Sequence, residues 1–391
     1  MLKYDRNLDI PNYGDKFFLN NAGASLMPVS VRQVIKDYLD KELEIGGYKL
    51  VDQEENAINQ FYEVTAHLLN CEPRNIAFAH DATDAYLKAL SAIPFEKGDV
   101  IITSTNDYSS NQIQFISLQQ RYGVTIKRIG STENGDLDMA HFRELLQDQK
   151  PKLVAITHIP TNSGLIQDVA TIGAICEQLD ILYLVDACQS VGQIQVDVQQ
   201  IKCDFLSATG RKFLRGPRGT GLLYVSDKIL NTGYAPLLID GWGAKWTEDY
   251  EFTMLPTAKR FETWERPFAL VVGLAAAVRI ANQLEMNAIE AYNVDLQSRL
   301  RANLAAIKGI RQYDLGSKRA NIITWRKEGV SLAATQAQLD AHHIYYSVSS
   351  LNWGLIDFRA KGVDWVIRFS PHYINTIEEM DRVAEILEGI K

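Results

Sequence analysis

The chain has 391 residues, of which 46% are hydrophobic and 23% are charged. This length exceeds what one hydrophobic core usually supports, so we expect one large domain with a smaller companion. The formal net charge is −8, which argues against partners that are nucleic acids or anionic membranes. A small-molecule partner is therefore favoured.

Charged residues interrupt every apolar stretch of residues 1–18, so this segment lacks the apolar region of a signal peptide. The longest apolar run, residues 268–278, is too short to cross a bilayer and is followed by Arg279. The seven histidines form no HExxH or Cys/His ligand pattern, and we expect no metal site. We expect a cytoplasmic protein whose four cysteines are reduced thiols without CxxC spacing: Cys71, Cys176, Cys188 and Cys203.

Short apolar runs alternate with amphipathic segments through the first two thirds of the chain. Both faces of the runs look buried, which predicts an α/β fold with a mostly parallel, doubly wound sheet. Ligands bind such sheets at the carboxyl ends of the strands. The predicted strands are residues 99–105, 124–130, 152–158, 181–187, 204–209 and 221–226, and the clearest crossover helices are 111–123 and 168–180.

The pattern changes after about residue 260. A long helical pattern over residues 267–306 predicts a helix that bridges two domains. We expect a large domain over 16–260, and a small α+β domain over 261–391 that includes the bridge and the N-terminal residues 1–15. Its predicted elements are residues 319–327, 333–344, 366–372 and 376–390.

The stretch "SATGRKFLRGPRGTG", residues 207–221, places Lys212 between an apolar run and a glycine-rich turn. Asp186 ends another apolar run, "ILYLVDACQS", where a carboxylate needs a cation or hydrogen bonds to compensate its burial. Asp186 could instead cap a helix, with Gln189 as its capping-box partner. A lysine, a buried carboxylate, an anion cradle and an aromatic residue are what pyridoxal 5′-phosphate requires.

In the order "THIPTN", "VDACQ", "SATGRK" and "GPRGTG", these motifs resemble the class V aminotransferase family. This is the fold-type I group that contains cysteine desulfurases, C–S lyases and isopenicillin-epimerase-like proteins. The similarity extends from "FLNNAGAS" at residues 18–25 to residues 370–383. It implies a pyridoxal-phosphate enzyme that acts on an amino acid and forms a homodimer.

The resemblance implies roles around the cofactor. Lys212 would form the Schiff base, Asp186 would pair with the pyridine nitrogen, and Gln189 would bond the phenolic oxygen. Phosphate would be held by the start of a helix in "DATDA", residues 81–85, where Asp81 replaces the family's glycine, although Thr83 could be a plain helix cap. The phosphate ligands that the resemblance implies are Ala82, Thr83, Thr209 and Arg211.

Further positions follow from the same resemblance. Tyr108 takes the place of the ring-stacking histidine of the desulfurases, and a tyrosine provides an aromatic face without imidazole's acid–base chemistry at neutral pH. Thr161 aligns with an asparagine near the phenolic oxygen, with Asn162 one residue out of register. Arg368 would grip the substrate carboxylate, the alternative being a solvated arginine. His372 would border the substrate, or serve as a structural histidine.

Residues 260–267, "RFETWERP", match a loop that in the family reaches the phosphate of the neighbouring subunit. Glu265 stands where relatives have threonine, and its carboxylate would repel phosphate. Arg266 is the candidate to replace that threonine.

Desulfurases that form a persulfide need a thiol on the loop before the carboxylate arginine, but residues 346–368 contain no cysteine. We therefore interpret Cys188 as a packing residue and expect β-elimination from a cysteine-type substrate. In this scheme the amino acid displaces Lys212, Arg368 holds its carboxylate, and the freed amine removes the Cα proton. Transamination is the first alternative and racemisation the second. Two further alternatives are a phosphate binder built on "GPRGTG" and a cofactor-binding regulator without turnover.

Overall fold

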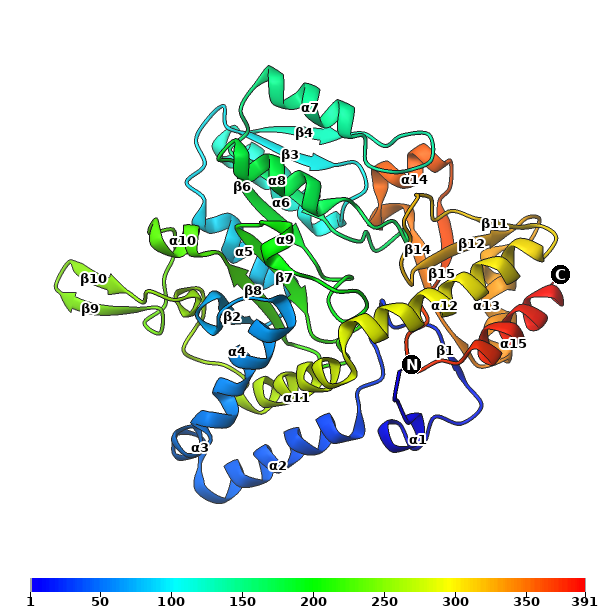
Figure 1. The fold of residues 1–391 in the computed structure, drawn as a ribbon, viewed down its shortest axis with the longest axis horizontal. Coiled ribbons are helices and arrows are strands. Elements are labelled where there is room, and N and C mark those ends of the chain that lie inside the picture. The colour runs from blue at the N-terminus through cyan, green and yellow to red at the C-terminus, as the bar shows by residue number, and fades with distance from the viewer. Residues whose placement is uncertain (1, 391) are drawn as a thin grey trace.

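The computed structural model describes residues 2–390, and its centre is a seven-stranded sheet with the order β2-β8-β7-β6-β5-β3-β4 (Figure 1). Strands β4, β3, β5, β6 and β7 run parallel, whereas β8 is antiparallel to both β7 and β2. The prediction of a mostly parallel α/β sheet is therefore confirmed. The strands are β2 (Ile76–Ala79), β3 (Val100–Ser104), β4 (Thr125–Ile129), β5 (Leu153–Thr157), β6 (Leu182–Asp186), β7 (Phe205–Thr209) and β8 (Gly221–Val225).

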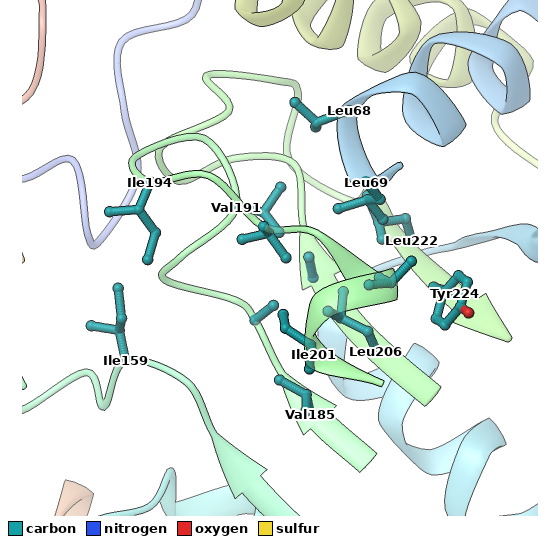
Figure 2. Packing of buried hydrophobic residues seen from close by; sticks show 14 of the residues in the cluster. Leu68, Leu69, Ile159, Val185, Val191, Ile194, Ile201, Leu206, Leu222 and Tyr224 are labelled. Atoms are coloured by element: carbon teal, nitrogen blue, oxygen red, sulfur yellow. The ribbon is translucent and has the colours of Figure 1, made fainter. Parts of the chain in front are cut away.

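Alternate residues of the central strands enter two different hydrophobic clusters. In β5, Val154 and Ile156 belong to one cluster, and Leu153 and Ala155 belong to the other. Because successive strand residues point to opposite faces, both faces of this sheet are covered. The first cluster, part of which Figure 2 shows, packs strands against α4 (Glu55–Leu69) and α11 (Phe268–Leu284). The second cluster packs them against α5 (Ala82–Ala92) and α6 (Ser109–Tyr122).

All six predicted strands form, but the sequence analysis missed β2, which is only four residues long.

Helices cover both faces of the sheet. The helices of this part are α2 (Val29–Ile45), α3 (Gly47–Gln53), α4 (Glu55–Leu69), α5 (Ala82–Ala92), α6 (Ser109–Tyr122), α7 (Met139–Asp148), α8 (Val169–Gln178), α9 (Val198–Ile201) and α10 (Asp227–Asn231). A hairpin of β9 (Ala244–Glu248) and β10 (Glu251–Met254) projects from it (Figure 1).

A four-stranded antiparallel sheet with the order β11-β12-β15-β14 forms the centre of the C-terminal part. Its core joins residues of α12, α13 and α15. The elements are β11 (Ile310–Gln312), β12 (Ile323–Lys327), α13 (Leu332–Ala341), β13 (Ile344–Tyr345), β14 (Ser347–Ser350), α14 (Leu355–Lys361), β15 (Trp365–Phe369) and α15 (Ile377–Glu388).

The N-terminal segment joins this second sheet region. Strand β1 (Phe17–Phe18) pairs in parallel with β13, and Asn20 bridges to Ser370. The N-terminal contribution to the C-terminal part therefore reaches residue 20, beyond the predicted limit of 15. The division into two domains itself stays a prediction.

The predicted helix over residues 267–306 is two helices, α11 (Phe268–Leu284) and α12 (Met286–Ala306), bent by 78°. Glu285 lies between them with a left-handed φ of 64°, which interrupts the helical hydrogen bonding. The sequence pattern missed this break because its residues are ordinary helix formers. Among residues 2–390, no single helix is long and apolar enough to cross a membrane; the bent pair together meets the length and composition test.

Candidate active site

A cavity of about 260 Å³ lies at the sheet edge where β5, β6 and β7 end. Cavities of about 530 and 990 Å³ lie elsewhere, but the predicted site residues line this smaller one. Nine residues that the sequence analysis singled out line it: Ala82, Thr83, Tyr108, Thr161, Asp186, Gln189, Thr209, Arg211 and Lys212.

Lys212 stands in the turn after β7 with 8% of its surface exposed. The turn packs tightly, because a Cβ at Gly210 would lie 2.4 Å from Thr220 Oγ1. Lys212 makes no ion pair within residues 2–390. Burial lowers the pKa of its ammonium, so more of the amine is neutral and nucleophilic than in an exposed lysine.

Asp186 is the last residue of β6 and is 4% exposed. Its Oδ1 accepts the Cys188 N–H at 2.9 Å, and its Oδ2 accepts from Asn111 Nδ2 at 3.1 Å. These bonds support a charged carboxylate, and no cation of the described residues pairs with it. The arrangement suits a protonated ring nitrogen that would supply the missing positive charge.

Asn111 and Asp107 belong to the site but were missed by the sequence analysis. Asn111 Nδ2 lies 3.0 Å from Asp107 Oδ1 and 3.1 Å from Asp186 Oδ2, so one amide connects two carboxylates. Asp107 also accepts from the hydroxyls of Thr103 and Thr157. Burial raises the pKa of Asp107, and its hydrogen bonds oppose that shift. The spacing of four residues at the start of α6 was the available signal.

The N-terminus of α5 points its first N–H groups at the cavity, with Ala82 and Thr83 in the lining. Asp81 is the N-cap, and its Oδ1 accepts the Asp84 N–H at 2.9 Å. A Cβ at Gly221 would lie 2.7 Å from the Asp81 main chain, so this glycine allows the helix to approach β8 closely. Free N–H groups and the helix dipole together favour an anion such as a phosphate.

Gln189 connects the cavity to the N-terminal loop. Its Nε2 donates to Thr161 Oγ1 at 2.9 Å and to Ala22 O at 3.2 Å, and its Oε1 is buried without a partner. Thr161 faces this site, whereas Asn162 donates to Trp353 O at 2.7 Å. Of the two register choices that the sequence left open, Thr161 is the one that lines the cavity.

Arg368 comes from β15 and lies beside the cavity, although it is not part of its lining. Its Nη1 donates to Thr161 Oγ1 at 2.8 Å and its Nη2 to Ser347 Oγ at 3.1 Å, while Nε is buried without a partner. Burial and the nearby charge of Arg211 lower the pKa of Arg368 to about 10, so it remains charged at neutral pH. No described carboxylate pairs with this buried cation, which makes it a seat for an external anion.

His372 does not line the cavity and is fully buried. Its Nε2 lies 2.9 Å from Phe213 O, and its Nδ1 lies 3.3 Å from Asn293 Oδ1. Burial holds the pKa of His372 well below its usual value. The expectation of a substrate contact is therefore corrected: both ring nitrogens face protein groups, which fits the structural alternative.

Arg266 is also buried and binds groups of the protein itself. It forms a buried ion pair with Glu262, which also accepts from Tyr62 Oη at 2.9 Å and from Phe78 N–H at 2.7 Å. Arg266 is 6% exposed, whereas Glu265 is exposed. Within the chain the Arg266 charge is paired with Glu262, and its contact with the phosphate of a neighbouring subunit stays a prediction.

Cys188, which the sequence predicts to be a packing residue, lines the cavity. Burial raises the pKa of its thiol and the neighbouring Lys212 opposes that shift. All four cysteines have free thiols, and none lies in the segment from β14 to β15 that precedes Arg368.

The fold and this cavity define a pyridoxal 5′-phosphate enzyme of fold type I. The residues fit the cofactor. Gln189 Oε1 is buried without a hydrogen-bond partner, and Lys212 and Asp186 line the same cavity without forming an ion pair among the described residues. Residues 17–383 match the family model described as Aminotransferase class-V, and the chain belongs to this family. Pyridoxal 5′-phosphate is its cofactor.

Alignments with similar proteins extend over nearly the whole chain. A protein named "Probable cysteine desulfurase" from Methanothermobacter thermautotrophicus is 27% identical over 399 residues, covering 99% of this chain and 97% of that protein. The apo cysteine desulfurase from Thermococcus onnurineus NA1 superposes with a TM-score of 0.90 at 24% identity, covering 99% and 98%. The cystine C–S lyase C-DES, in complex with its product cysteine persulfide, gives a TM-score of 0.86 at 20% identity, covering 97% and 99%. The two structures share the fold of this chain.

Proposed function

We propose that this chain is a C–S lyase that catalyses β-elimination from a cysteine-type amino acid. The observation that carries this choice is the absence of any cysteine in residues 346–368. The named relatives include cysteine desulfurases and a cystine C–S lyase, so sulfur-containing amino acids are the favoured substrates. Without a thiol before Arg368, no protein group there can receive the sulfur as a persulfide.

In this proposal the chain's own residues bind the reactants from three directions. Arg368 would hold the α-carboxylate through its guanidinium, which forms no ion pair among residues 2–390. The N-terminus of α5 would hold the phosphate. Asp186, fixed by Cys188 N–H and Asn111 Nδ2, keeps a proton on the ring nitrogen. Tyr108, which lines the cavity, would provide an aromatic face for the ring.

Proton transfer falls to Lys212. Pyridoxal 5′-phosphate, when bound, supplies a carbonyl for the substrate amine and a conjugated ring that accepts the electron pair left at Cα. The Lys212 amine, whose pKa is lowered by burial, removes the Cα proton. The Cβ–S bond then breaks, the sulfur leaves with the bonding pair and takes up a proton as a thiol, and the remaining 2-aminoacrylate is hydrolysed by water to pyruvate and ammonia.

One panel of substrates tests the reaction. The loaded enzyme is incubated with cysteine, cystine, S-alkyl cysteines and alanine, and thiol, pyruvate, ammonia and keto acid are measured. Pyruvate together with released thiol supports the lyase. Keto acid formed in turnover only when a second keto acid is added identifies an aminotransferase, and loss of optical activity without either product identifies a racemase. No product and no spectral change with any compound identifies a regulator.

We also infer a homodimer. Large apolar side chains are exposed on and near the β9–β10 hairpin, and such a surface is typical of a protein interface. Sedimentation at micromolar concentration measures the mass, and a monomer under these conditions contradicts the inference. The exposed residues are Leu237, Leu238, Trp246, Tyr250, Phe252 and Trp264.

A further inference from the structure

The turn directly after Lys212 has an unusual backbone. Arg215 adopts a left-handed φ of 60°, and its N–H donates to Lys212 O at 2.8 Å. A residue with a side chain adopts this conformation at a cost of about 1 kcal/mol. Such strain persists only where the surroundings fix it.

The Arg215 side chain provides that fixation. It is fully buried and forms an ion pair with Asp9 at 2.5 Å. Its Nε donates to Leu26 O at 2.9 Å, and its Nη1 donates to Tyr373 Oη at 3.0 Å. Its partners therefore come from the N-terminal helix α1 (Arg6–Asp9), from the loop between β1 and α2, and from the segment after β15.

His372 holds the same turn at Phe213, the residue directly after Lys212. Its Nε2 lies 2.9 Å from Phe213 O, and because a carbonyl oxygen only accepts, Nε2 carries the hydrogen. The imidazole also packs edge-on against the Phe213 ring, with centroids 5.1 Å apart. Two consecutive residues, His372 and Tyr373, thus grip the turn that follows the lysine.

We propose that His372 and Arg215 are positioning residues that aim the Lys212 amine at the Cα of the substrate. Arg368 lies four residues before His372, so one segment holds the substrate carboxylate at one end and the lysine turn at the other. The segment thereby sets the spacing between the substrate and its base. This inference rests on the proposed function, because it requires Lys212 to transfer the Cα proton.

The spacing matters because proton transfer requires close approach. A misplacement of about 1 Å costs on the order of 100-fold in rate. Loss of the His372 bond would free Phe213 O and allow the turn to relax, while Arg368 would still bind the carboxylate. The expected defect is therefore in kcat rather than in KM.

His372→Phe and His372→Gln in the full-length holoenzyme separate positioning from packing. Phe keeps a ring but removes the donor, whereas the Gln amide can donate to Phe213 O. We expect kcat of His372→Phe to fall about 10- to 100-fold with KM changed less than about threefold, and His372→Gln to recover most of the loss. Hydrogen exchange of residues 208–217 should accelerate in His372→Phe, both with and without cofactor.

Arg215→Lys is the second variant, and Arg301→Lys is its matched control. Arg301 is also buried and paired, with Asp314 at 2.6 Å, but it lies in the C-terminal part away from the cavity. We expect both variants to lose thermal stability. Only Arg215→Lys should lower kcat and change the pH at which the visible absorbance of the bound cofactor shifts.

Two results would overturn the positioning role. The first is a His372→Phe enzyme with normal kcat and normal exchange of residues 208–217. The second is a His372→Gln enzyme as impaired as His372→Phe, with Arg215→Lys matching the Arg301→Lys control. If the wild-type enzyme releases no thiol from any substrate, the proposed function fails. Exchange and absorbance in the variants still report on the turn in that case.

Discussion

Buried cations in two regions of the molecule are treated in opposite ways. At the cavity, Lys212 and Arg368 are buried and have no ion pair among residues 2–390. Away from it, Arg266 pairs with Glu262, and Arg301 pairs with Asp314. A buried charge without a counter-charge is costly unless a ligand compensates it. Arg260 is also buried without an ion pair, but its guanidinium donates to the main-chain carbonyls of Leu230 and Tyr234. The unpaired charges beside the cavity support a binding site there, and the ion pairs of Arg266 and Arg301 are parts of the scaffold.

Lys212→Ala should have the largest effect. In the proposed mechanism the Lys212 amine both attaches the cofactor and acts as the base, so activity should fall by about 10³-fold or more. The visible absorbance of the bound cofactor should also disappear. A variant that keeps this absorbance would show that another residue holds the cofactor. It would also contradict the argument that the buried Lys212, which has no ion pair, marks the binding site.

Arg368→Lys should come next. A lysine keeps the charge but loses the two-pronged geometry that binds a carboxylate. We expect KM for the amino acid to rise about 30- to 100-fold, the equivalent of about 2–3 kcal/mol in charge-assisted hydrogen bonding. Steady-state kinetics measure the change. An unchanged KM would place the carboxylate elsewhere.

Asn111→Ala tests the network behind Asp186. The variant removes the amide that connects Asp107 and Asp186, so the two carboxylates should repel each other more strongly. We expect kcat/KM to fall about tenfold, together with a shift of the cofactor absorbance. Asn134→Ala, at an exposed asparagine, is the control and should change neither.

Cofactor capture should depend on pH through Lys212. The neutral amine is the reactive form, and burial lowers its pKa, so capture by the cofactor-free protein should accelerate as the pH rises. The rate should level off below the ordinary lysine pKa of about 10.4. The appearance of absorbance after mixing measures it. A plateau only above that value would contradict the lowered pKa.

Glu262→Gln should have the smallest effect on catalysis. It leaves the Arg266 charge buried without its partner, which should destabilise the fold by about 3 kcal/mol. At a temperature where the variant is folded, kcat/KM should remain within about twofold, a minor effect in free energy. Thermal unfolding and kinetics measure the two effects. A large loss of activity in the folded variant would show that residues 260–267 contribute to the site.

Much of the site could be predicted because its parts lie in short motifs. Lys212, Asp186 and Thr83 each stand at the end of a strand or the start of a helix, and those ends share one edge of the sheet. Asp107 and Asn111 were not predicted, because their role depends on the hydrogen bond from Asn111 to Asp186 across the sheet edge. His372 was misjudged because its partner, Phe213 O, is a main-chain atom far away in the sequence.

The sequence by itself determined the order of the motifs along the chain, the mostly parallel sheet and nine of the residues that line the cavity. These features follow from local periodicity and from the rule that parallel strands end together. Only the tertiary structure decided which buried charges are paired, where the bridging helix breaks, and what holds the turn after Lys212. These outcomes depend on contacts between distant segments, and local sequence patterns carry no information about such contacts.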